Sequence, residues 1–101
     1  MAFIKLGEIS DIPNGTVKLY HVNNREIAIC NANGEIYAVD NMCTHDEGSL
    51  EEGELENCEL ECPLHGARFD VRNGEVMQGP AVMPLDTFEV RITNNTIEVK
   101  V

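Results

Sequence analysis

One residue separates Cys43 from His45, and two residues separate Cys62 from His65. Sixteen residues lie between His45 and Cys62, so each short segment supplies one cysteine and one histidine. Two thiolates and two imidazoles are enough ligands to close a metal site. The spacing of these four residues therefore predicts a metal centre to which two loops contribute.

The mixed ligand set is compatible with two kinds of centre. Structural zinc sites usually group their cysteines and their histidines separately, as C-x2-4-C followed by H-x3-5-H. A two-iron cluster can instead take two cysteines on one iron and two histidines on the other. The pairing of one cysteine with one histidine in each segment favours the iron cluster and leaves a zinc-held structural module as an alternative.

The sequence around these ligands resembles the Rieske [2Fe-2S] family, and its length and pattern are most similar to the small soluble ferredoxins of that family. The resemblance runs across nearly the whole chain and is carried by CTHDEG at 43–48, CPLHGARFD at 62–70 and GPA at 79–81. It implies one cluster, with Cys43 and Cys62 on one iron and His45 and His65 on the other. The residues that it places around the cluster are Leu64, Gly66 and Pro80.

The resemblance also predicts a low reduction potential. High-potential members of the family carry a disulfide between the ligand loops and two hydroxyl groups aimed at the cluster sulfurs. This chain has Gly48 and Leu64 at the disulfide positions, and Ala67 and Phe69 at the hydroxyl positions. We therefore expect a potential near the bottom of the Rieske range, at about −150 mV.

Two further cysteines and one further histidine lie outside this ligand set. Cys30 belongs to an apolar run and is interpreted as a buried core residue, whereas Cys58 has no assigned role. A disulfide between them is not expected in a reducing cytoplasm. His21 is the only spare histidine, and the mononuclear iron of a terminal oxygenase would need two further histidines and a carboxylate. The chain by itself cannot be that oxygenase.

Acidic residues dominate the charge and restrict the partners. The 101 residues include 18 acidic and 7 basic ones, a net charge of −11, which argues against nucleic acid or an anionic membrane surface as a partner. Eight of the acidic residues lie between His45 and Cys62. They form either a solvated loop or a surface that steers basic partners towards the centre. The residues that we expect to dock a partner are Asp46, Glu47, Glu51 and Glu52.

Turn signals recur at short intervals and predict an all-β fold. Asn33-Gly34 lies between runs of alternating apolar residues, a strong hairpin signal because both turn residues must adopt positive φ. The expected strands are a meander at 16–22, 26–30 and 35–39 and a C-terminal hairpin at 87–92 and 96–101. Short antiparallel strands of this kind are typical of a β-sandwich or barrel.

The length indicates a single domain over residues 1–101. Its antiparallel β base is expected to cover 1–40 and 85–101, with a small cluster-binding subdomain inserted at about 41–84. The sequence has no run of about 18 apolar residues and no signal-peptide pattern, so we expect a cytoplasmic protein.

These observations favour an electron carrier over an enzyme. The sequence shows no nucleophile–base pair, phosphate loop or dinucleotide fingerprint. The resemblance implies a monomeric ferredoxin that takes single electrons from an NAD(P)H-dependent flavoprotein reductase and passes them to a terminal Rieske oxygenase. The alternative is the small Rieske-like subunit of a nitrite reductase.

Overall fold

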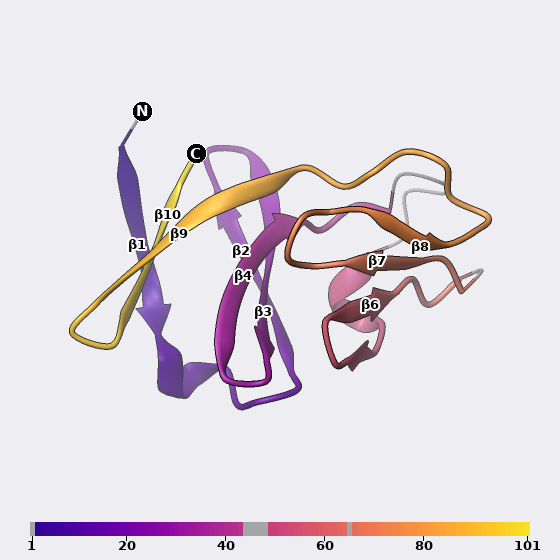
Figure 1. Cartoon of the computed structure of the whole chain (residues 1–101). Coiled ribbons are helices and arrows are strands. Elements are labelled where there is room, and N and C mark those ends of the chain that lie inside the picture. Colours follow the sequence, from indigo (N-terminus) through magenta and orange to yellow (C-terminus); the bar gives the residue numbers. More distant parts are fainter. Residues whose placement is uncertain (1, 44–48, 65) are drawn as a thin grey trace.

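The computed structural model describes residues 2–43, 49–64 and 66–101, which form an all-β fold of two antiparallel sheets (Figure 1). The six-stranded sheet, in the order β1-β10-β9-β4-β3-β2, consists of β1 (Phe3–Glu8), β2 (Val17–Val22), β3 (Arg25–Ala32), β4 (Glu35–Asp40), β9 (Thr87–Thr93) and β10 (Thr96–Lys100). The four-stranded sheet, in the order β5-β6-β7-β8, consists of β5 (Leu55–Glu56), β6 (Glu59–Glu61), β7 (Arg68–Asp70) and β8 (Val76–Gln78). The helical segments of the described residues are two 3-10 turns, η1 (Ile9–Asp11) and η2 (Leu50–Glu52). The prediction of an all-β fold is confirmed.

Asparagine residues with positive φ close the main hairpins. The turn between β3 and β4 has φ of 57° at Asn33 and 89° at Gly34, and the turn between β9 and β10 has 49° at Asn94 and 68° at Asn95. Positive φ at both central residues gives the turn a twist that matches the flanking strands. The predicted meander and C-terminal hairpin are confirmed, since β2 pairs with β3, β3 with β4 and β9 with β10.

The strand β1 is not indicated by the sequence pattern. It pairs with β10, and its register shifts between Lys5 and Gly7. A bulge of this kind breaks the alternation of apolar and polar residues that marks a strand in the sequence. The register shift therefore accounts for the missed element.

The central strand β3 carries the core on both of its faces. Ala28 and Cys30 belong to a buried cluster that reaches Phe69 of β7, whereas Ile29 belongs to a second cluster that includes Val99 of β10. The prediction that Cys30 is a buried core residue is confirmed, and its burial raises the pKa of the thiol to about 12. The division into a base and an inserted subdomain stays a prediction, because both sheets contribute to one buried cluster.

Figure 1 shows the two sheets at opposite ends of the molecule. The strands β1, β9 and β10 and both termini lie at one end, and β6, β7 and β8 lie towards the other. The segments that follow β4, β6 and β8 extend to this second end. None of the helical segments in the described ranges has the length and apolarity needed to cross a bilayer.

Candidate metal centre

Cys43 and Cys62 are both buried, with 1% and 0% of their surfaces exposed, and they belong to one apolar cluster. Cys43 follows β4 of the larger sheet, and Cys62 follows β6 of the smaller sheet. Ala81, from the predicted proline-containing segment, is buried in the same cluster. The structure thus brings the two predicted thiolate ligands into one environment. The predicted imidazole ligands, His45 and His65, lie outside the described residues.

Asn41 closes the first ligand segment at its base. Its side chain is fully buried; the amide nitrogen donates to the Ser49 hydroxyl at 2.8 Å, and the amide oxygen accepts from the Glu51 N–H at 2.8 Å. One buried amide therefore ties the end of β4 to the chain that returns into η2. Asn41 is absent from the predicted site residues. An asparagine directly after a strand and two residues before a ligand is the signal that points to it.

The second ligand segment is a tight turn closed by backbone hydrogen bonds. The N–H of Cys62 donates to the carbonyl of Ala67 at 2.7 Å, and the N–H of Gly66 donates to the carbonyl of Cys62 at 3.2 Å. Gly66 has a φ of 77°, which favours glycine because a side chain would be strained there. The side-chain amide of Gln78 in β8 donates to the Gly66 carbonyl at 3.0 Å. These bonds fix the chain on both sides of position 65.

The residues predicted to surround the cluster differ in their exposure. Leu64 and Pro80 are exposed, and Gly66 is half-buried. Ala67 and Phe69 stand at the positions where high-potential members carry hydroxyl groups. Both are fully buried in the apolar core cluster that contains the two cysteines. The apolar side chains at these two positions offer no hydroxyl donor to a group bound by the thiols, as the low expected potential requires.

Arg68 of β7 neutralises part of the acidic segment. Its guanidinium contacts Glu59 at 3.0 Å, Glu61 at 2.8 Å and Glu56 at 3.5 Å. The side-chain hydrogen bond to Glu59 is the largest cause that raises the pKa of Arg68. Three of the eight acidic residues before Cys62 are therefore engaged within the fold, a pairing that their sequence positions do not reveal.

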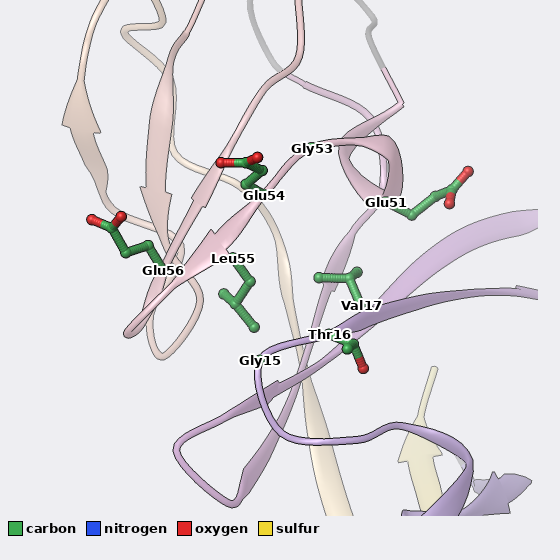
Figure 2. Close-up of a pocket in the computed structure, with 8 residues that line it drawn as sticks. All are labelled: Gly15, Thr16, Val17, Glu51, Gly53, Glu54, Leu55 and Glu56. Atoms are coloured by element: carbon green, nitrogen blue, oxygen red, sulfur yellow. The ribbon is translucent and has the colours of Figure 1, made fainter.

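The predicted docking residues are only partly described. Glu51 is half-buried and Glu52 exposed, both on η2, whereas Asp46 and Glu47 lie outside the described residues. A hollow of about 410 Å³ lies beside this turn and is lined by residues 15–17, 51 and 53–56. Figure 2 shows these residues. The side chains of Val17 and Leu55 line the hollow, and the carboxylates of Glu51, Glu54 and Glu56 point away from its centre. The hollow does not bring carboxylates together on a common point, so it does not form a cation site.

An ion pair between the buried carboxylate of Asp70 and the exposed guanidinium of Arg72 stabilises the turn after β7. Asp70 is 4% exposed and accepts two hydrogen bonds from the Arg72 guanidinium, at 3.0 and 2.8 Å. These bonds hold the pKa of Asp70 below its usual value. The same turn receives Cys58, whose carbonyl accepts from the Val71 N–H at 2.8 Å. Cys58 is half-buried at the edge of the apolar core cluster. All four cysteines lie among the described residues, and no disulfide joins any of them.

The donor set fits an iron–sulfur cluster of mixed ligation. Two buried thiols share an apolar environment, and each is followed within three residues by a histidine of the sequence. Thiolates and imidazoles are the ligands that a two-iron centre with two cysteines and two histidines uses. The buried apolar surround is also the kind that limits solvent access to such a centre.

Comparison with known proteins agrees with this donor set. Residues 2–89 match the model of the Rieske [2Fe-2S] domain. Over 92 residues, the chain is 44% identical to the ferredoxin component of the naphthalene 1,2-dioxygenase/salicylate 5-hydroxylase systems of Ralstonia sp, a match that covers 91% of this chain and 88% of the relative.

Solved structures show the same fold. The ferredoxin of carbazole 1,9a-dioxygenase from Nocardioides aromaticivorans IC177 superposes with a TM-score of 0.94 at 29% identity, covering 98% of this chain and 97% of that one. A chain from the complex of reduced oxygenase and oxidized ferredoxin in carbazole 1,9a-dioxygenase has a TM-score of 0.91 at 33% identity, with 96% of this chain and 100% of that chain covered. The chain therefore belongs to the Rieske [2Fe-2S] family, and its cofactor is one Rieske-type [2Fe-2S] cluster.

Proposed function

We propose that this chain is a soluble, cytoplasmic one-electron carrier that accepts electrons from an NAD(P)H-dependent flavoprotein reductase and delivers them to a terminal oxygenase. The observation that carries the proposal is the burial of Cys43 and Cys62 in one apolar cluster of a ferredoxin-like fold. A relative at 44% identity is a ferredoxin component of dioxygenase systems, and one at 33% comes from a complex with an oxygenase. When bound, the cluster supplies a one-electron redox couple.

The proposed ligands are Cys43 and Cys62 for one iron and His45 and His65 for the other. The two cysteines are held by different elements: Asn41 anchors the first segment, and the turn closed by Gly66 anchors the second. These anchors lie in the backbone and in a buried amide, so they hold the two cysteine segments through protein contacts. Leu64, Gly66 and Pro80 are proposed to border the cluster.

Asp46, Glu47, Glu51 and Glu52 are proposed to steer basic partners to this end of the molecule. Exposed charge raises the rate of encounter more than the affinity of the complex. Electron-transfer complexes are small and short-lived, so a fast encounter is the property that such a carrier needs.

The alternatives derived from the sequence have less support. A zinc-held module is disfavoured because the matching family model is a [2Fe-2S] domain. A nitrite reductase subunit is disfavoured because the relative at 44% identity is a ferredoxin component of dioxygenase systems.

Reconstitution tests the carrier function. NADH, a flavoprotein ferredoxin reductase and the oxygenase component of naphthalene 1,2-dioxygenase are combined with and without this protein, and oxidation of naphthalene is measured. We expect turnover to depend on the added protein. Protein with a full cluster that supports no turnover, and that is not reduced by the reductase, would contradict the proposal.

Ligand variants test the site separately. We expect Cys43→Ser and Cys62→Ser to abolish retention of two irons and two sulfides per chain. Cys58→Ser is the matched control, because Cys58 packs at the edge of the same apolar core cluster and is not a proposed ligand. We expect this variant to retain both the irons and the sulfides. Full cluster content in either ligand variant would overturn the assignment.

A further inference from the structure

Asparagine is followed by glycine three times in the chain, at 14–15, 33–34 and 73–74. An Asn-Gly pair can deamidate: the backbone nitrogen of the glycine attacks the carboxamide carbon of the asparagine, the new C–N bond closes a succinimide ring, and ammonia leaves. Water then opens the ring to aspartate or isoaspartate. Glycine favours this reaction because it has no side chain to hinder the closing ring.

The fold engages the attacking nitrogen of all three pairs in hydrogen bonds. The N–H of Gly15 donates to the carbonyl of Asn31 at 2.8 Å, and the N–H of Gly74 donates to the carbonyl of Asp70 at 2.7 Å. The N–H of Gly34 donates instead to the side-chain oxygen of Asn31, at 3.0 Å. A bonded N–H must open before it can lose its proton, as in hydrogen exchange, so each bond slows the attack.

Asn31 is held in place by hydrogen bonds from its backbone and from its side chain. The residue is 6% exposed, its side-chain nitrogen donates to the Ile12 carbonyl at 2.8 Å, and its backbone N–H donates to the Thr16 carbonyl at 3.0 Å. Figure 1 shows the turn between β3 and β4 beside the loop that precedes β2, which these bonds connect. The side-chain oxygen of Asn31 is therefore fixed at the base of that turn.

The pair at 33–34 differs from the other two because its protection depends on a side chain. Gly15 and Gly74 donate to backbone carbonyls, which no side-chain substitution removes, whereas Gly34 relies on one side-chain oxygen. Asn33 and Gly34 are both exposed, so water has access to the reacting groups. We propose that Asn33 is a latent deamidation site, and that the buried side chain of Asn31 controls its rate by binding the Gly34 N–H.

Deamidation at this turn has a path to the core that contains the ligand cysteines. Isoaspartate lengthens the backbone of the turn, across which Ala32 pairs with Glu35, and the length of a hairpin turn sets the register of its strands. Ala32 is buried in the same apolar core cluster as Cys43 and Cys62. We therefore expect protein that has deamidated at Asn33 to lose its iron–sulfur cluster sooner, as read from the decay of visible absorbance.

The test follows the three Asn-Gly pairs separately within each protein. Cluster-loaded wild type and Asn31→Ala are incubated in mildly alkaline buffer, and mass spectrometry of peptides measures the fraction deamidated at each pair over time. The substitution removes the acceptor of the Gly34 N–H but keeps the carbonyl that binds the Gly15 N–H. Asn41→Ala is the control for lowered stability, because it removes a different buried amide and leaves the acceptor of Gly34 in place.

We expect Asn31→Ala to speed deamidation of Asn33 about fivefold, the factor that corresponds to one lost hydrogen bond. Asn14 and Asn73 should deamidate at their wild-type rates in the same protein, because the acceptors of their glycines are retained. In the Asn41→Ala control, Asn33 should also deamidate at its wild-type rate.

Two results would overturn the proposal. Deamidation of Asn33 at the wild-type rate in Asn31→Ala would show that the side chain does not control it. Equal acceleration at all three pairs would assign the change to global unfolding. If Asn31→Ala does not fold, hydrogen exchange of the wild type decides: we expect the Gly34 N–H to be protected, and exchange at the rate of an unstructured chain would contradict the proposal.

Discussion

The side-chain amide of Asn41 donates a hydrogen bond of 2.8 Å to the hydroxyl of Ser49, and so joins the two ends of the segment that starts at Cys43. Because the amide is fully buried, its loss leaves Ser49 and the N–H of Glu51 without their partner. We expect Asn41→Ala to lower the free energy of unfolding by about 2–3 kcal/mol and to speed loss of the cluster. Urea unfolding and the decay of visible absorbance measure the two effects.

Ser49→Ala is the graded control for this prediction. It removes the hydroxyl acceptor of the Asn41 amide but keeps the amide oxygen that accepts from the Glu51 N–H, so its effect should fall between those of the wild type and Asn41→Ala. Equal stability and cluster lifetime in all three proteins would show that Asn41 does not position the segment.

Asp70 should contribute to stability in a pH-dependent way. The hydrogen bonds from the Arg72 side chain hold the pKa of Asp70 below its usual value, so the ionised carboxylate stabilises the fold at neutral pH. This contribution is present above the unfolded-state pKa of about 3.9 and is lost as the pH falls through the lower, folded-state pKa. We expect Asp70→Asn to destabilise the protein by about 1–3 kcal/mol at pH 7 and by less at acid pH.

Urea midpoints measured between neutral and acid pH check this prediction. Asp86→Asn is the control, because Asp86 contacts Arg25 at 3.6 Å and its side chain is 77% exposed, a geometry that contributes little. A constant difference between the wild type and Asp70→Asn at every pH would contradict the role of the depressed pKa.

Cys30 and Cys58 should differ sharply in reactivity. Burial raises the pKa of the Cys30 thiol to about 12, so almost none of it is ionised at pH 8, and the side chain is closed to solvent. Cys58 is half-buried at the edge of the apolar core cluster to which Cys30 belongs. Because the thiolate is the nucleophile, we expect iodoacetamide to modify Cys58 and to spare Cys30 in the cluster-loaded protein. Mass spectrometry of peptides reads the result, and equal labelling of the two would contradict it.

Gly53 joins η2 to β5 at a point where no side chain fits. A β-carbon at this position would collide with the carbonyl oxygen of Glu61, the residue that precedes Cys62. We expect Gly53→Ala to destabilise the protein by about 1–3 kcal/mol or to displace the second ligand segment. Gly79→Ala is the control, since a β-carbon there meets no atom within 4 Å. Thermal unfolding that places both variants at the wild-type midpoint would contradict the close packing.

The acidic residues on η2 should act through long-range attraction. We expect the double variant Glu51→Gln/Glu52→Gln to slow reduction of the oxygenase roughly two- to fivefold at low salt. The difference should disappear at high salt, because the charges are screened. Glu89→Gln, at an exposed position of β9, is the control for loss of a negative charge away from η2. A salt response identical in all three proteins would mean that these glutamates only solubilise the chain.

Local signals predicted most of the fold and of the donor set. Turns such as Asn33-Gly34 are read from adjacent residues, and the two cysteine–histidine pairs lie within four-residue stretches. The strand β1 was missed because its bulge removes the alternating pattern. The contributions of Asn41 and Arg68 were missed because their partners lie between seven and fifteen residues away and meet only in the folded protein.

The midpoint potential of the cluster-loaded protein, measured by direct voltammetry, tests the central claim most directly. Two buried cysteines in an apolar cluster without hydroxyls at Ala67 and Phe69 predict a reversible one-electron wave near the bottom of the Rieske range, at about −150 mV. Such a potential suits a carrier that is reduced by NAD(P)H through a flavoprotein. A wave above zero, or no wave from protein that holds stoichiometric metal, would contradict the account.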